Sequence, residues 1–273
     1  MPETPALSPY IAHALVTECP LQAWAEHRLL GNCIKISDQA LALRERGSAI
    51  HSLVLEDGEK IVALEHDSYR SKAAQAERDE TRAAKKIPIL AKDMGPLHDL
   101  SGRIFSMLDG LGYGIAEGLA ERKIQWQETS PMGSVLCSGI PDWVSPDATR
   151  WVDLKTTTAS VHPDACAAAM VRGAAVIQDS AYTSAMEILH PENTGRVSGI
   201  FLFAQSVPPF ALTPVYCAGS MRQLGESRWQ HAIALWEQCL ANDNWPSHAD
   251  QPIPLEAPPW AVAKAMELEE RNA

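Results

Sequence analysis

Two aspartates and a lysine lie close together in the stretch GIPDWVSPDATRWVDLKTT, residues 139–157. Asp153 and Lys155 are two residues apart in a segment that reads as a strand, so both side chains point to the same face. Asp142 lies upstream, across the turn-forming residues SPDATR, on the expected neighbouring strand. Burying charges is costly unless they are paired or bind a metal. The pattern therefore predicts a metal site that cleaves a phosphodiester bond.

The expected chemistry follows from the side chains that converge there. Two carboxylates make an oxygen-rich site of the kind that Mg²⁺ or Mn²⁺ prefers, and a cation offsets their repulsion. A divalent ion polarises a phosphoryl oxygen, activates water and stabilises the leaving oxygen, and two ions can divide these roles. Lys155 is then placed to orient or deprotonate the water, or to balance phosphate charge. The alternative is an ordinary surface pair of Asp153 and Lys155, worth less than about 1 kcal/mol.

The composition limits the class of protein. The chain has 273 residues, of which 46% are hydrophobic and 21% charged, which fits one large domain or a domain with a helical insertion. A net charge of −11 argues against a nucleic-acid partner unless cations gather along one groove. No apolar stretch is long enough to cross a membrane, and the N-terminus lacks the pattern of a secretory signal. We therefore expect a cytoplasmic protein.

Hydrophobic periodicity and turn residues predict the elements that position these side chains. Helices are expected within 7–30 (broken at Pro20), 37–57, 68–90, 96–114, 164–190 (with a break at Gly173) and 218–243. Strands are expected at 119–128, 134–146 and 150–158, as an antiparallel meander, and two more within 196–217 around a Pro-Pro turn. This order predicts an α/β fold with a mixed central sheet, whose faces are covered by helices 160–190 and 218–241.

We expect a single domain over residues 1–273. It would consist of a mainly helical part at 1–115, a part at 116–245 that holds the catalytic sheet and its helices, and a C-terminal tail at 246–273.

A basic segment lies within residues 68–90. It contains Arg78, Arg82, Lys85 and Lys86. One interpretation is a solvated helix with internal ion pairs, and the other is a basic arm that contacts a phosphate backbone. On the second interpretation these four residues bind DNA.

The spacing PD-x10-D-x-K resembles the PD-(D/E)xK nuclease superfamily, and other segments resemble its RecE-type branch (exodeoxyribonuclease VIII), which is related to lambda exonuclease. RGSAIHSLVLE is similar to a G-x-x-x-H-x-x-x-L-E segment whose histidine binds metal, which implies His51. AERKIQW resembles the strand before the PD motif, whose glutamate faces the metals, which implies Glu121. VIQDSAYTSAM resembles the following helix with its Q-x3-Y pair, Gln178 and Tyr182. The resemblance covers roughly residues 7–262.

The resemblance implies an activity and a site. It implies a Mg²⁺-dependent exonuclease, with Mn²⁺ as a substitute and two ions per site, that degrades double-stranded DNA ends 5′ to 3′. The remaining 3′ strand would serve a single-strand annealing protein in recombination. The implied metal ligands are His51, Glu121, Asp142, Asp153 and the Leu154 carbonyl. Lys155 would be the catalytic lysine, while Gln178 would hold a phosphate or the lysine and Tyr182 would pack by a base or sugar.

The same resemblance implies an assembly. Relatives form rings through which DNA passes, so a trimer or a tetramer is expected, with positive charge lining the bore. The long N-terminal extension of RecE is absent, which fits a compact phage or prophage nuclease. The second acid of the motif is Asp153 rather than the glutamate of many members.

Three alternatives stay open at this point. The first is a Cas4-like or AddB-like repair nuclease with another polarity or a preference for single strands. The second is a nuclease fold that holds DNA or a protein partner without cutting, and the third is a soluble α/β protein without an active site. Cas4-like and AddB-like enzymes hold an iron–sulfur cluster with one N-terminal cysteine and three near the C-terminus. Cys19 lies in a similar context, but Cys217 and Cys239 are far apart and no third cysteine follows, so no cluster is expected.

Overall fold

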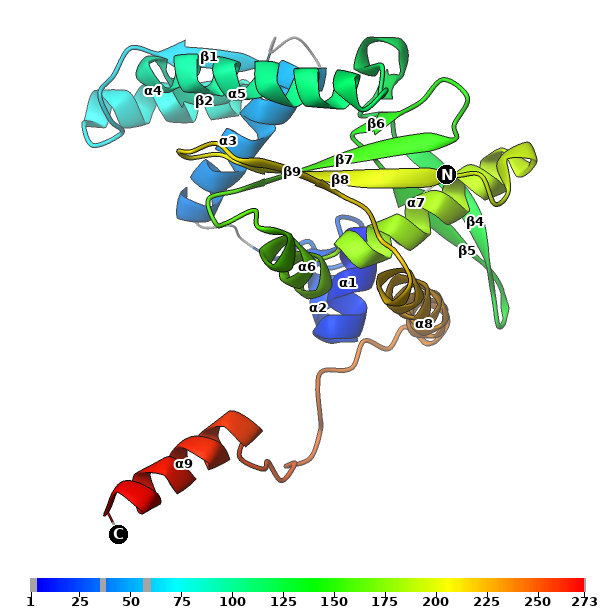
Figure 1. Cartoon of the computed structure of the whole chain (residues 1–273). Helices are drawn as coiled ribbons and strands as arrows, with labels where there is room; N and C mark the ends of the chain where they lie inside the picture. The colour runs from blue at the N-terminus through cyan, green and yellow to red at the C-terminus, as the bar shows by residue number, and fades with distance from the viewer. Residues whose placement is uncertain (1–3, 35–37, 56–59, 273) are drawn as a thin grey trace.

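A five-stranded mixed sheet forms the centre of the computed structural model (Figure 1), which describes residues 4–34, 38–55 and 60–272. The strand order is β3-β6-β7-β8-β9. The strands span Leu119–Ala120 (β3), Trp143–Val144 (β6), Arg150–Thr157 (β7), Ser198–Gln205 (β8) and Leu212–Val215 (β9). β7 and β8 pair in parallel, whereas the other neighbours are antiparallel. The mixed α/β fold that the sequence predicts is confirmed.

The two faces of the sheet pack against different helices because side chains alternate along β7. Trp151 belongs to a core cluster that includes residues of α7 (Ala175–Leu189). Val152 and Leu154 belong to a second cluster with residues of α3 (Asp38–Leu55) and α5 (Ala91–Gly110). Asp153 and Lys155 therefore lie on the α7 face, and the apolar residue between them packs against α3 and α5.

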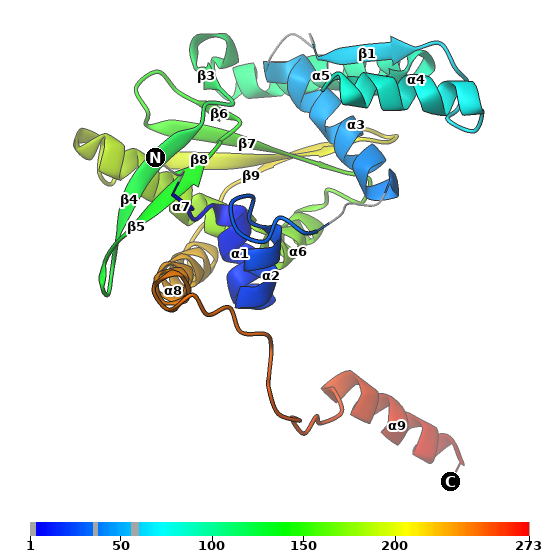
Figure 2. The same cartoon turned by 180° about the vertical axis from the view of Figure 1, so that it is seen from behind.

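Helix α8 (Ser220–Asn242) does not cover a face of the sheet, so this part of the expected layering is wrong. It packs against α7 and against α1 (Pro9–Thr17), outside the first helical layer. Its buried residues Trp229 and Trp236 bind it there, with the Trp229 ring 6.2 Å from that of Trp126. Figures 1 and 2 both show α3, α4 and α5 on one side of the sheet and α1, α2, α6 and α8 on the other.

The expected three-stranded meander is also wrong, because the chain leaves the central sheet after β3 and returns at β6. Glu121 adopts a positive φ of 45°, which ends the expected strand 119–128 after two residues. The next strands, β4 (Ile124–Ser130) and β5 (Gly133–Gly139), form a separate two-stranded hairpin. This detour brings Glu121 and the residues before β6 to one end of the sheet.

A small parallel pair of strands flanks α4 (Lys72–Ala83). These are β1 (Ile61–Leu64) and β2 (Ile87–Leu90). The helix expected over 68–90 ends at Ala83, since Pro88 and the β-branched residues Ile87 and Ile89 disfavour helix and favour strand.

The predicted helix breaks are confirmed. Pro20 separates α1 from α2 (Pro20–Glu26), and Gly173 separates α6 (Pro163–Arg172) from α7. Short 3₁₀ turns lie at Ile115–Glu117 (η1) and Pro191–Asn193 (η2). A last helix, α9 (Pro259–Asn272), follows an extended segment. Within the described ranges, no helix has the length and apolar character needed to cross a bilayer.

Candidate active site

Three side chains with metal-binding atoms lie close together near the edge of the sheet that β3 and β6 form. One ligand atom each from His51, Glu121 and Asp142 lies within 4.8 Å of the other two. His51 Nδ1 is 3.3 Å from Asp142 Oδ1. One imidazole nitrogen and two carboxylates fit a divalent cation of the Mg²⁺ or Mn²⁺ class, which prefers oxygen ligands and tolerates a histidine.

Helix α3 brings His51 to this cluster through a close approach at Gly47, one turn earlier. A Cβ atom at Gly47 would lie 2.7 Å from Thr156 Oγ1, at the end of β7. Only glycine lets the helix backbone pass the strand at this distance without a shift. The glycine of the G-x-x-x-H pattern therefore sets the distance of His51 from the sheet.

The two acids are held by backbone contacts at the sheet edge. Glu121, in its left-handed backbone conformation, donates its N–H to the Asp142 carbonyl at 3.0 Å. Asp142 lies directly before β6, and its Oδ2 accepts the Leu154 N–H at 2.5 Å. In a strand the N–H and C=O of one residue face the same side. The Leu154 carbonyl therefore also faces this edge, beyond the end of β6.

Asp153 and Lys155 form a network with two side chains of α7. Lys155 Nζ lies 2.5 Å from Asp153 Oδ1 and donates to Gln178 Oε1 at 2.7 Å. The Gln178 amide donates to Asp153 Oδ2 at 2.9 Å and to Tyr182 Oη at 3.4 Å. Tyr182 donates in turn to the Ile140 carbonyl at 3.3 Å. Gln178 thus holds both the carboxylate and the amine.

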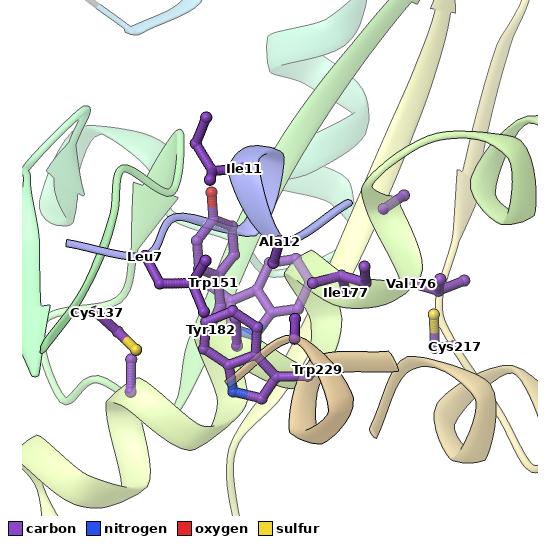
Figure 3. Close-up of a cluster of buried hydrophobic side chains, with 14 of the residues drawn as sticks. Leu7, Ile11, Ala12, Cys137, Trp151, Val176, Ile177, Tyr182, Cys217 and Trp229 are labelled. Carbon is purple, nitrogen blue, oxygen red and sulfur yellow. The ribbon is translucent and has the colours of Figure 1, made fainter. Parts of the chain in front are cut away.

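Contacts within the hydrophobic core hold the Tyr182 ring in place. Figure 3 shows it beside Trp151, whose ring packs edge-on at 5.5 Å. A Cβ atom at Gly139 would lie 2.7 Å from the Tyr182 ring, so the end of β5 passes close to it. Tyr182 is 3% exposed. Its ring is therefore structural here, and contact with a base or sugar would require it to move.

Burial and neighbouring charges shift the pKa values of Asp153 and His51. Burial is the main cause that raises the pKa of Asp153 to about 6, and the Asp142 charge adds to it, while Lys155 and His51 act in the opposite direction. Burial lowers the pKa of His51, but the charges of Asp142, Asp153 and Glu121 outweigh it and the net shift is upward. A divalent cation bound beside these carboxylates would stabilise their ionised forms.

Asp153 lies beside the three-residue cluster rather than within it. Both of its carboxylate oxygens already have partners in Lys155 and Gln178. Coordination of an ion by Asp153 would require it to share or exchange one of these contacts. Its role as a metal ligand stays a prediction.

A cleft of about 680 Å³ opens on the cluster. Its lining consists of His51 and Glu121 with Leu43, Arg44, Gly47, Ser48, Ser52, Lys60, Ile87 and Thr156. The cations Arg44 and Lys60 were not among the sequence-based candidates. Arg44, Ser48 and His51 are spaced at 4 and 3 residues, so helical periodicity gives a signal for Arg44. We see no sequence signal for Lys60.

In the basic segment within residues 68–90, the two arginines predicted to bind DNA already contact other residues of the chain. Arg82 binds Glu45 of α3 through two hydrogen bonds, at 2.6 and 2.9 Å. Arg78 pairs with Asp79 at 2.8 Å and lies over the Tyr69 ring. The structure favours the ion-paired helix for these two arginines. Lys85 and Lys86 are exposed between α4 and β2, and their contact with DNA stays a prediction.

Comparison with known proteins finds a matching family model and a solved structure of similar fold. The family model of the PD-(D/E)XK nuclease superfamily matches residues 7–250. The crystal structure of a "Putative exonuclease" from Eubacterium rectale aligns with a TM-score of 0.54 at 11% identity, over 96% of this chain and 93% of that one. The crystal structure of SSO0001 aligns with a TM-score of 0.36 at 11% identity, over 91% of this chain and 81% of that one. No curated protein matches the chain.

Proposed function

The chain belongs to the PD-(D/E)XK nuclease superfamily, and from this premise we propose that it is a Mg²⁺-dependent exodeoxyribonuclease. It would degrade linear double-stranded DNA 5′ to 3′ and leave a 3′ strand for an annealing protein in recombination. The observation that supports this most is the meeting of His51, Glu121 and Asp142 beside the Asp153–Lys155 pair. The name of the Eubacterium rectale protein, which shares the fold, supports an exonuclease among the activities of the superfamily.

The metal would be held by His51, Glu121 and Asp142, with the Leu154 carbonyl as a further oxygen. Mg²⁺ fits these ligands, and Mn²⁺ would substitute for it. A bound cation supplies Lewis acidity to the phosphate and lowers the pKa of water. We propose two ions per site, and the second would use an oxygen of Asp153.

Lys155 would act on the attacking water or on the phosphate. Its side chain is 27% exposed, so it can be reached by substrate, yet Asp153 and Gln178 hold its amine in one place. A held amine can orient the water, assist its deprotonation or offset the charge that develops on the phosphate. Removal of Lys155 should therefore impair the chemistry more than the binding of metal.

The substrate would be bound by cations near the cluster rather than by the overall charge. Arg44 and Lys60 line the same cleft as His51 and Glu121, where a phosphate backbone would have to lie. The chain as a whole carries −11 charges. A ring of three or four copies, with such cations facing the bore, would reconcile an acidic protein with processive digestion. The ring belongs to the proposal.

Digestion of end-labelled DNA tests this function. Linear duplex with a 5′-phosphate, the same duplex with a 5′-hydroxyl, and a closed circle are each incubated with the full chain and Mg²⁺. We expect loss of the 5′-ended strand of linear DNA, no cutting of the circle, and no activity with a chelator. Lys155→Ala should be inactive and the exposed Lys92→Ala should match the wild type. Absence of Mg²⁺-dependent cleavage would overturn the function, and loss of the 3′-ended strand would overturn the polarity.

A further inference from the structure

The C-terminal residues 247–272, called the arm below, extend away from the body of the protein. The body ends at Trp245 and Pro246, where the Pro246 carbonyl accepts the Leu21 N–H at 3.1 Å and the Trp245 ring packs on Trp236 at 5.3 Å. Figures 1 and 2 both show α9 apart from the rest of the chain. The four prolines of residues 247–259 restrict the connecting segment to extended conformations and remove backbone donors. The extended connecting segment therefore holds α9 away from the body.

The arm is apolar and acidic at the same time. Leu255 is 88% exposed and Trp260 72% exposed. The other large apolar side chains of the arm that are exposed are Ile253, Val262, Met266 and Leu268. The arm contains five acidic side chains against one lysine and one arginine. Apolar side chains gathered on one exposed segment mark a contact surface, since scattered surface residues would not cluster in this way.

A groove with the complementary character lies elsewhere on the body. It has a volume of about 460 Å³ and is lined by residues of β3, of the turn between β6 and β7, and of the end of α7. Leu119 and Leu189 are 46% and 42% exposed there. Arg122 and Lys123 also line it, both are exposed, and within the described residues neither has a salt-bridge partner. The groove therefore offers apolar surface beside two uncompensated cations.

We propose that the arm of one copy docks into this groove of a second copy. The apolar side chains of the arm would cover Leu119 and Leu189, and its carboxylates would lie near Arg122 and Lys123. The arm's extended connection directs it away from its own body. A contact of this kind joins two different surfaces, so it is heterologous, and repeated copies close into a ring or continue as a filament. The inference does not depend on the nuclease chemistry.

The size of the full chain in solution tests the docking first. Light scattering over a concentration series should show oligomers for the wild type. Leu255→Asp with Trp260→Asp in the arm, or Leu189→Asp in the groove, should each weaken association by at least tenfold. Met132→Asp is the matched control, because Met132 is 61% exposed at the turn of the β4–β5 hairpin, outside both surfaces. It should keep the wild-type size.

Mixing the two variants then separates this contact from a symmetric interface. The arm variant retains an intact groove and the Leu189→Asp variant retains an intact arm. An equimolar mixture should therefore form heterodimers at a concentration at which each variant alone is monomeric. Circular dichroism and thermal unfolding verify that each variant folds. If Leu189→Asp fails to fold, Arg122→Glu with Lys123→Glu replaces it.

Four results would overturn the proposal: a monomeric wild type at all concentrations, an arm variant of wild-type size, a groove variant of wild-type size, or a mixture without heterodimers. The first of these would mean that the arm packs on its own chain or serves a different partner. Nuclease activity is measured separately, so failure of the docking and failure of the proposed function are distinguishable.

Discussion

Replacement of Gln178 by alanine tests how the site holds its lysine. The Gln178 amide accepts a hydrogen bond from Lys155 at 2.7 Å and donates one to Asp153 at 2.9 Å. Both partners are charged groups, and Asp153 is only 4% exposed. The alanine variant would leave an oxygen of Asp153 without this donor and would free the Lys155 amine to move.

The magnitude follows from these two contacts. A hydrogen bond to a charged group contributes about 1.5–3 kcal/mol. The contact with the buried Asp153 should count in full, whereas the Lys155 amine, on a side chain that is 27% exposed, can bind water in place of Gln178. We therefore expect the free energy of unfolding to fall by about 2–4 kcal/mol. If a loss of about 1.5–3 kcal/mol in the positioning of Lys155 reaches the transition state, kcat falls about 10- to 100-fold. KM should change little, because Gln178 does not line the cleft.

Single-turnover cleavage of end-labelled duplex measures this effect. Gln127→Ala is the matched control, since Gln127 is an exposed amide on β4. Gln178→Glu keeps an acceptor for Lys155 but places a carboxylate against Asp153, which should raise the pKa of Asp153 and move the pH–rate profile upward. A Gln178→Ala enzyme with wild-type kcat and only a lower Tm would refute the reasoning, because the residue would then be structural alone.

Three further predictions concern the elements around the site. His51→Ala should weaken Mn²⁺ binding at least tenfold in a calorimetric titration; an unchanged affinity would remove His51 from the ligands. Gly47→Ala should lower both kcat and Tm, because the gain of about 1 kcal/mol in helix propensity offsets only part of a clash of about 1–3 kcal/mol with Thr156. Gly47→Ala combined with Thr156→Ala should recover activity, and equal defects in both variants would contradict this. Burial raises the pKa of Asp179 to about 6, so its ionised form destabilises the fold, a cost that is absent at acid pH and complete above pH 6. Asp179→Asn should therefore raise the free energy of unfolding by up to about 3 kcal/mol at pH 7.5 and by much less at pH 4.5, and equal gains in urea denaturation at both pH values would count against this.

Local rules were sufficient for the part of the site that lies on one strand. The two-residue period of a strand predicted that Asp153 and Lys155 share a face, and the four-residue spacing of Gln178 and Tyr182 predicted a common helical face. The structure places both pairs in one network. The predicted roles in catalysis stay predictions.

The rest of the site and the layering of the helices depend on tertiary contacts that no local sequence pattern contains. The alternating pattern predicts a strand at Glu121, but the chain turns there into a separate hairpin. The basic helix read equally well as a DNA-binding arm, because its partner Glu45 lies on a different helix, 37 residues away from Arg82. The buried tryptophans of α8 predict that the helix packs against other elements, but the sequence does not indicate which ones.

The central claim is that His51, Glu121 and Asp142 together bind a divalent cation that cleavage needs. Titration of Mn²⁺ into the wild type, Asp142→Ala and Lys155→Ala, followed by cleavage of linear duplex by the same samples, tests it most directly. We predict that Asp142→Ala loses both binding and cleavage, whereas Lys155→Ala keeps the wild-type affinity and loses cleavage. Equal Mn²⁺ affinity in the wild type and Asp142→Ala would contradict the account.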